Sequence, residues 1–248
     1  TEIFDLDLGQ SLKDIQTLIY SSTKKFMIKH EDNLDLNKKI KLPFSHIPSK
    51  SDWSDMMNKI NNSNELKELI SHKSIIDQFK KIFDNPKKYD ICKFRARYPD
   101  EERVIYNWHQ DEGTWYLSKN KNYLKKFTAT MWLSINGSNK SNSIQLIKKS
   151  HKYKLYEHSY VKGQGYFNAK IDQKDQNYFN DILTVETKPS QAIIFHPLTL
   201  HRSVTSNNTN KRIPRYSIDV RYYDDKKNTQ NLKYVRRKNT EFLLEKIH

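Results

Sequence analysis

The sequence contains one cysteine, five glycines and no long hydrophobic run among its 248 residues. The lone thiol, Cys92, excludes an internal disulfide and any zinc site built from several cysteines. No segment approaches the about eighteen consecutive apolar residues that a membrane-spanning helix requires. Neither a glycine-rich phosphate-binding loop nor the strained serine turn of the α/β-hydrolases is present.

The N-terminal residues and the cysteine content together indicate where the protein works. The first ten residues, TEIFDLDLGQ, are too polar and acidic for a secretory signal peptide. A chain with a single thiol needs no oxidising compartment for disulfide formation. The sequence therefore predicts a cytoplasmic location, and it leaves the oligomeric state open.

The net charge is strongly positive, at +15, from 44 Lys and Arg against 29 Asp and Glu. Charge of this size is compatible with a nucleic-acid or anionic-membrane partner, or with a lysine-rich surface that has no specific partner. The lysines are interspersed with Asn, Asp and Glu, which favours the second interpretation. Basic runs at 119–126, 148–154 and 226–237 could still attract a phosphorylated or carboxylated small molecule.

The first third of the chain, residues 1–88, is predicted to be a helical support. Ser11 is a candidate cap for a segment in which apolar residues recur at helical spacing. Two further helices are predicted at 52–60 and 65–83, the second ending before Pro86.

From Tyr89 onward the pattern is typical of short strands, and residues 89–223 are predicted to form the core of a barrel. The predicted strands are Asp90–Tyr98, Val104–His109, Phe127–Ile135, Ser143–Ile147, Ile182–Thr187, Gln191–Phe195 and Arg215–Tyr223. Because no helical pattern lies between them, a mainly β antiparallel barrel or sandwich with flanking helices is expected. Residues 153–181 lack periodicity and suggest a lid or binding loop, and 224–248 form a C-terminal extension of what is predicted to be one domain, 1–248.

A metal site is predicted from two short motifs. Residues two apart on a strand share one face, so His109 and Asp111 of WHQD can bind one ion. The run that follows residue 195 adds His196 and His201 as candidates for a third ligand. Two histidines and one carboxylate leave three coordination positions open, as in non-haem Fe(II) oxygenases. Those positions can accept a bidentate keto acid and dioxygen.

A second motif, Arg215-Tyr216-Ser217, predicts the site for the far end of that keto acid. Arginine offers two parallel donors to a carboxylate, and Ser217 faces the same side of the strand. Arg212 is a rival for the same role. We prefer Arg215, because it keeps the R-x-S spacing and its distance to the later Arg221-Tyr222 pair.

WHQDEGTW, QLIKKSHK and the run from Ile193 through HPLTLHRS to RIPRYSIDVRY resemble the phytanoyl-CoA dioxygenase family of 2-oxoglutarate oxygenases. The first motif is similar to the ectoine hydroxylase branch. The resemblance covers about residues 90–223 and implies a double-stranded β-helix, a squashed jelly-roll barrel. It implies Fe(II), 2-oxoglutarate and dioxygen as cofactor and co-substrates. Lys148-Lys149 before Ser150-His151 departs from the family's Pro-Gly, so that turn is expected to differ.

The resemblance also assigns residues. It implies iron ligands at His109, Asp111 and His201, because the H-x-S pattern fits His201-Arg202-Ser203 better than His196. Arg215 would bind the distal carboxylate of 2-oxoglutarate. The remaining predicted cofactor contacts are Ser217, Thr128, Thr130 and Lys93, and the predicted substrate contacts are Trp115, Arg95, Arg97 and Gln110.

The function that follows is hydroxylation of a small molecule, anionic or carrier-linked, with release of succinate and carbon dioxide. The carboxylate of Asp111 argues against halogenation, since the related halogenases lack it. Two alternatives remain: an oxygenase that modifies nucleic acid, suggested by the net charge, and a cupin-like binding protein without turnover. Glu112, His151 and His158 are interpreted as a solvated side chain, a structural hydrogen-bonding residue and a surface or core histidine.

Overall fold

The computed structural model describes residues 2–27, 33–98, 106–117, 127–152, 154–161, 166–171, 173, 175, 180–204, 213–224, 232–236 and 242–246. Its largest sheet runs in the order β1-β9-β4-β11-β2, with β3 also paired to β11. These strands are β1 (Ile3–Asp5), β2 (Lys87–Lys88), β3 (Lys93–Arg97), β4 (Phe127–Ser134), β9 (Gln191–Phe195) and β11 (Arg215–Asp224). All of their pairings are antiparallel.

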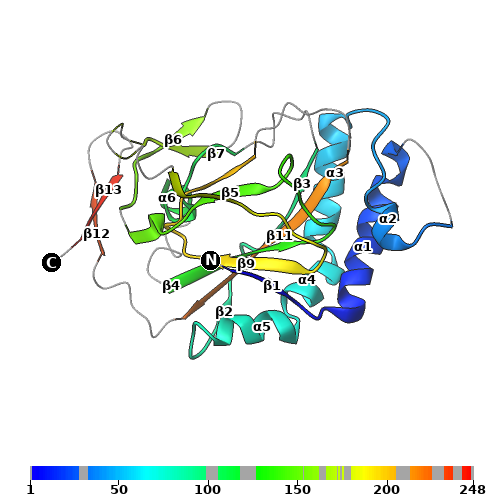
Figure 1. Ribbon diagram of the computed structural model, residues 1–248, viewed down its shortest axis with the longest axis horizontal. Helices are drawn as coiled ribbons and strands as arrows, with labels where there is room; N and C mark the ends of the chain where they lie inside the picture. The colour runs from blue at the N-terminus through cyan, green and yellow to red at the C-terminus, as the bar shows by residue number, and fades with distance from the viewer. Residues whose placement is uncertain are drawn as a thin grey trace.

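A smaller sheet faces the large one and closes the barrel (Figure 1). It consists of β10 (His201–Ser203), β5 (Ile144–Ile147) and β8 (Ile182–Thr184) in that order. Between the two sheets lies a hydrophobic cluster that includes Trp132, Leu146 and Phe195. Two antiparallel sheets packed in this way confirm the predicted double-stranded β-helix.

Side chains of β11 point alternately into the hydrophobic core and into the cavity between the sheets. Tyr216, Ile218 and Val220 are fully buried in the main core. Arg215, Asp219 and Arg221 point to the opposite face and line a cavity between the sheets. Because side chains alternate along a strand, one ten-residue strand both anchors the helices and presents charge to the site.

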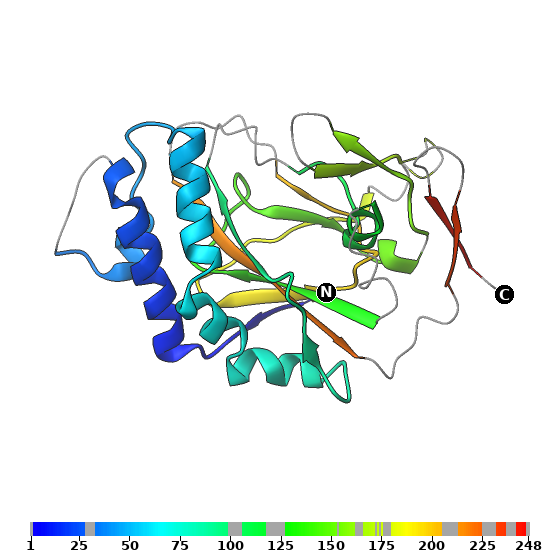
Figure 2. The same cartoon turned by 180° about the vertical axis from the view of Figure 1, so that it is seen from behind.

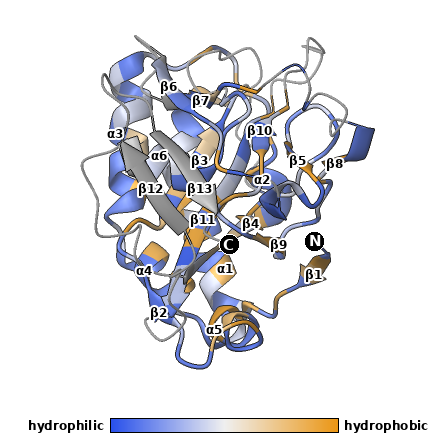
Figure 3. Ribbon diagram, turned by 90° about the vertical axis from the view of Figure 1, so that its left-hand side faces the viewer, coloured by the Kyte–Doolittle hydropathy of each residue, from blue (hydrophilic) through white to orange (hydrophobic). Residues whose placement is uncertain are grey.

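Helices cover the outer face of the large sheet (Figure 2). They are α1 (Gly9–Thr23), the 3-10 turn η1 (Lys24–Phe26), α2 (Leu36–Lys39), α3 (Lys50–Asn61), α4 (Asn64–Ile70) and α5 (Lys73–Lys80). Helices α3, α4 and α5 carry both hydrophilic and hydrophobic residues (Figure 3), as expected for amphipathic helices. Their apolar faces meet the core-facing residues of β4 and β11 in one cluster.

The helix predicted at 52–60 is confirmed as α3, whereas two other helix predictions are wrong in detail. Helix α1 begins at Gly9 after Leu8, so Ser11 lies inside the first turn and is not the cap. The single helix predicted for 65–83 is two helices. Helix α4 ends at Ile70, and His72 then caps the start of α5 by accepting a hydrogen bond from the Ser74 amide. Helix α5 ends at Lys80, well before Pro86.

Six of the seven predicted strands are confirmed, with β11 extending one residue beyond its predicted end, but the strand at 104–109 is not. Residues 104 and 105 lie outside the described part, and 106–109 contribute only an isolated bridge at His109. The stretch 153–181, predicted as a loop, contains a hairpin of β6 (His158–Val161) and β7 (Tyr166–Ala169). The C-terminal extension forms a second pair, β12 (Leu232–Arg236) and β13 (Phe242–Lys246).

Within the described ranges, no helix is long and apolar enough to cross a membrane. The residues predicted as a helical support also contribute β1 and β2 to the large sheet. The N-terminal third is therefore part of the barrel's wall as well as its cover.

Candidate metal centre

The first ligand motif lies in a turn between a bridge and a helix. The amides of His109 and His201 each donate to the other's carbonyl at 3.0 Å. Helix α6 (Asp111–Leu117) begins two residues later. The prediction that His109 and Asp111 lie on one strand is therefore wrong, because Asp111 begins a helix. Both side chains nevertheless reach one site. Glu112, predicted to be solvated, is buried because it lies in this helix and not in a strand.

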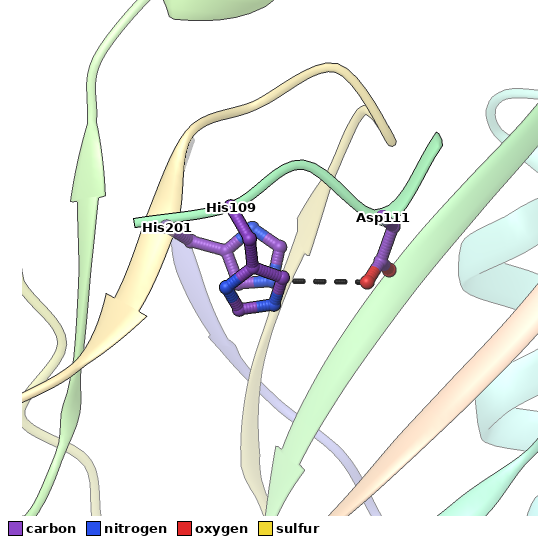
Figure 4. Close-up of side chains that lie close together, drawn as sticks. All are labelled: His109, Asp111 and His201. Carbon is purple, nitrogen blue, oxygen red and sulfur yellow. Dashed lines mark ion pairs between the residues drawn. The ribbon is translucent and has the colours of Figure 1, made fainter. Parts of the chain in front are cut away.

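Three side chains converge where the two sheets meet. His109, Asp111 and His201 each offer one ligand atom, and these atoms lie within 4.8 Å of one another. Figure 4 shows the two imidazoles side by side, with the carboxylate of Asp111 pointing toward them. Asp111 Oδ1 lies 3.8 Å from His201 Nε2. No other such group of three occurs in the described part of the chain.

Both histidines are held in the tautomer that a metal requires. His109 Nδ1 lies 2.7 Å from the Asn107 carbonyl, and His201 Nδ1 lies 2.9 Å from the Thr199 carbonyl. A carbonyl can only accept, so each Nδ1 must carry the hydrogen. In the neutral ring, Nε2 then keeps the lone pair that binds a metal. Burial, with His201 nearby, also lowers the pKa of His109 well below its usual value, which keeps this imidazole neutral.

Asp111 is also prepared as a ligand. Its Oδ2 accepts hydrogen bonds from Thr130 Oγ1 at 2.7 Å and from Arg221 Nη2 at 3.1 Å and Nε at 3.3 Å. Burial alone would raise the pKa of Asp111, but Arg221, the two histidines and Thr130 outweigh it and lower the pKa below its usual value. The carboxylate therefore remains ionised, with Oδ1 directed to the histidines.

This donor set fits a ferrous ion. Two neutral imidazole nitrogens and one carboxylate oxygen on one side of an ion form the facial arrangement of non-haem Fe(II) oxygenases. The second atom of each ligand is already hydrogen-bonded, which is how proteins orient metal ligands. Sequence reasoning found the three ligands but missed Arg221, because its contact with Asp111 joins segments far apart in the chain.

The turn that carries His109 and Asp111 is itself held by buried side chains. The Gln110 amide donates to the carbonyls of Lys154 and Leu198 and accepts from the Tyr156 amide. His158 Nε2 accepts from the Gln110 backbone at 2.9 Å. His158 is thus a buried core residue that fixes the ligand turn, a role with no sequence signal beyond its position in an aperiodic stretch.

Next to the triad lies a cavity of about 530 Å³. It contains most of the side chains that were predicted to contact cofactor or substrate: Thr130, Lys93, Trp115, Arg95, Arg97 and Arg215. Thr128, Ser217 and Gln110 are buried but do not line it. The bonds described above make Gln110 a support of the ligand turn.

Arg215 lies on the cavity wall in a position suited to an anion. Its Nε donates to the Asn142 carbonyl at 3.1 Å, and its Nη1 donates to Ser217 Oγ. The guanidinium lies 5.4 Å from the centre of the Trp132 ring. Burial and neighbouring Arg97 lower the pKa of Arg215 to about 9, so the buried cation lacks full compensation. The rival residue Arg212 lies outside the described residues.

Arg97 is a second buried cation beside Arg215. The two residues are register partners on β3 and β11. Arg97 Nη1 donates weakly to the Ser143 carbonyl at 3.4 Å, and its buried Nε has no hydrogen-bond partner in the described part of the chain. Burial lowers the pKa of Arg97 to about 10. Two adjacent guanidinium groups with no carboxylate partner among the described residues create a strongly anion-attracting wall.

The rival ligand His196 is turned away from the triad. Its Nδ1 accepts a hydrogen bond from the Leu198 amide at 3.1 Å, and its ring packs near that of His151. His151 was predicted to make structural hydrogen bonds in the turn at 150–152. In the described residues it is Ser150 that bonds to Ile147 and Leu200. The choice of His201 over His196 is confirmed.

Comparison with known proteins adds a family and a fold. A sequence model of the phytanoyl-CoA dioxygenase family matches residues 42–215. No curated protein sequence matches the chain. Among solved structures, the non-heme monooxygenase ThoJ in its apo form aligns with a TM-score of 0.54 and 15% identity, covering 88% of this chain and 71% of ThoJ.

Two other solved structures are similar to the same extent. EvdO2 from Micromonospora carbonacea var. aurantiaca, complexed with 2-oxoglutarate, gives a TM-score of 0.52 at 12% identity, covering 89% of this chain and 84% of EvdO2. The non-heme alpha ketoglutarate dependent carbocyclase SnoK from nogalamycin biosynthesis gives 0.52 at 13% identity, covering 90% and 79%. At these identities the likeness establishes a shared fold.

Proposed function

This chain belongs to the phytanoyl-CoA dioxygenase family of non-haem Fe(II)- and 2-oxoglutarate-dependent oxygenases, and we propose that it hydroxylates a small anionic molecule. Iron held by His109, Asp111 and His201 supplies dioxygen activation coupled to the oxidative decarboxylation of 2-oxoglutarate. In the overall reaction, one atom of dioxygen enters succinate and the other enters a C–H bond of the substrate. Carbon dioxide is the third product.

The protein's own contribution is to orient the co-substrate and exclude water. Arg215, fixed by Ser217 and the Asn142 carbonyl, binds the distal carboxylate of 2-oxoglutarate with its remaining donors. Of the other predicted cofactor contacts, Lys93 on β3 and Thr130 on β4 line the same cavity, whereas Thr128 does not. The complex of the similarly folded EvdO2 with 2-oxoglutarate supports the same co-substrate here.

The positive charge of the cavity lining is the main support for an anionic substrate. Seven basic side chains line it against two acidic ones, Asp111 and Asp219. Ferrous iron and the two carboxylates of 2-oxoglutarate cancel each other's charge, so binding both leaves the excess in place. A cation buried without a counter-ion is costly, and Arg97 is a buried cation with no ion-pair partner in the part of the chain that the structure describes. A carboxylate or phosphate on the substrate would remove that cost.

The size and lining of the cavity favour a small molecule. Its volume of about 530 Å³ lies within the range typical of metabolite pockets. Trp53, Met57 and Trp115 add apolar surface to its lining. The substrate is therefore expected to combine an apolar body with an anionic group.

The test is succinate formation from 2-oxoglutarate with Fe(II) and dioxygen, screened over carboxylates, phosphate esters, acyl thioesters and neutral analogues of the same shape. We expect anionic compounds to stimulate succinate formation while their neutral analogues do not. Stimulation confined to neutral compounds would contradict the proposed substrate class. Stimulation by oligonucleotides alone, with the steep salt dependence of phosphate contacts, would point instead to nucleic acid. No binding of 2-oxoglutarate at all would indicate a barrel without turnover.

A further inference from the structure

One oxygen of the ligand carboxylate Asp111 is fully occupied by the protein. Three hydrogen bonds reach Oδ2, one from Thr130 and two from Arg221, whereas none is made to Oδ1 in the described part of the chain. Thr130 lies on β4 and Arg221 on the neighbouring β11. The large sheet therefore holds Oδ2 away from the histidines and leaves Oδ1 as the single free oxygen.

Arg221 is rigidly placed for this task. It is buried, and its Nη1 donates to the Ile91 carbonyl at 3.0 Å. Its Nη2 also approaches Asp219 Oδ2 at 3.5 Å, and its guanidinium lies 5.5 Å from the centre of the Trp115 ring. Every nitrogen of the guanidinium thus has a partner. A planar fork held on all sides fixes the plane of the carboxylate that it contacts.

The contact between Arg221 and Asp111 affects how many coordination positions of the metal Asp111 can occupy. A carboxylate can bind a metal through one oxygen or through both. Two histidines and a one-oxygen carboxylate occupy three of six positions, and 2-oxoglutarate then takes two more, leaving one for dioxygen. If Asp111 used both oxygens, no position would remain once the co-substrate was bound.

We propose that Arg221 is a positioning residue that restricts Asp111 to binding iron through one oxygen and so keeps the dioxygen position open. This inference rests on the iron centre proposed above. It adds a role for a residue outside the ligand triad and outside the arginine that binds the co-substrate.

Arg95 provides a matched control for this proposal. It is also an arginine of the cavity wall, on the strand paired with β11, and its Nε donates to the same Asp219 Oδ2 at 3.0 Å. Its other bond, from Nη1, goes to Tyr106 Oη at 3.3 Å. Arg95 makes no hydrogen bond to Asp111, so replacing it disturbs the Asp219 pair without releasing the ligand carboxylate.

The experiment uses Mn(II) in place of iron and measures the relaxation of water protons, which reports exchangeable water bound to the metal. In wild type with saturating 2-oxoglutarate, one water should remain on Mn(II). In Arg221→Gln that water should be lost and the Kd for Mn(II) should rise about tenfold to a hundredfold, the usual range for partners of metal ligands. Arg221→Lys, which keeps the charge but not the fork, should fall between, and Arg95→Gln should resemble wild type.

The outcomes separate this proposal from the iron centre itself. Failure of wild type to bind Mn(II) and 2-oxoglutarate would count against the centre. Normal wild-type binding, with the bound water kept in both Arg221 variants, would overturn the positioning role alone. If Arg221→Gln does not fold, the water count in Arg221→Lys decides: loss supports the proposal, and retention overturns it.

Discussion

His109 and His201 are joined through their backbones, each amide donating to the other's carbonyl at 3.0 Å, and their ring centres lie 4.1 Å apart. Two of the three ligands are thus positioned by the fold before any metal binds. The third, Asp111, is positioned by the helix that begins there and by the bonds to Oδ2. A site prepared in this way loses little conformational entropy when it binds an ion.

Gly113 is predicted to be essential for the ligand turn. It lies in α6 against His158, and a Cβ at this position would overlap the His158 ring. We expect Gly113→Ala to lower the free energy of unfolding by about 1–3 kcal/mol, as overpacking usually does. Urea unfolding would measure this.

The Gly113 prediction has an internal control in a double-mutant cycle. With His158→Ala as background the ring is gone, so the added methyl group should cost much less. An equal cost in both backgrounds would show that the ring is not what excludes alanine.

Stability is predicted to fall in mild acid because of His158. Burial lowers its pKa to about 4, and its Nε2 accepts a hydrogen bond that only the neutral ring can accept. The unfolded chain has a histidine pKa of about 6.5, so between about pH 6.5 and pH 4 it binds more protons than the folded state. This one group should therefore cost about 3 kcal/mol of stability across that interval.

Urea unfolding at several pH values tests the His158 prediction. The stability of His158→Gln should depend less steeply on pH than that of wild type below pH about 6.5, while the exposed His46→Gln serves as the control. Burial also lowers the pKa of His196 to about 4, so part of the slope should persist. A slope identical in wild type and His158→Gln would contradict the assignment.

Arg215 is predicted to govern affinity for 2-oxoglutarate. Arg215→Met removes a buried, charge-assisted contact with a carboxylate, which is worth about 1.5–3 kcal/mol, so the Kd should rise about tenfold or more. Quenching of tryptophan fluorescence can report binding, since Trp132 lies beside the guanidinium. Arg212→Met is the control for the rival assignment, and a larger rise in Kd for it than for Arg215→Met would reverse our choice.

The strands that carry the site were predictable because their signals are local. In β11, polar and apolar residues alternate from Arg215 to Tyr222, so both the strand and its site face could be predicted from the sequence. Strand β10 was missed because it has only three residues, and it exists through its pairing with β5. Its pairing partner is far along the chain, where no periodicity can indicate it.

The ligand triad was predictable from residue types and spacing, but its geometry was not. A strand was predicted at His109, yet its only ladder contact is the bridge to His201, and Asp111 begins a helix. The role of Arg221 was not predicted either. Its contact with Asp111 depends on the register of β11 in the sheet, which is a tertiary property. The break between α4 and α5 did have a local signal, the capping side chain of His72.

Anaerobic calorimetry with Fe(II), followed by 2-oxoglutarate, tests most directly whether His109, Asp111 and His201 bind one metal ion. Wild type and His196→Ala should each bind one ion per chain and then the co-substrate, whereas His109→Ala, Asp111→Ala and His201→Ala should bind neither with comparable affinity. Wild-type binding in His201→Ala, or its loss in His196→Ala alone, would contradict the account.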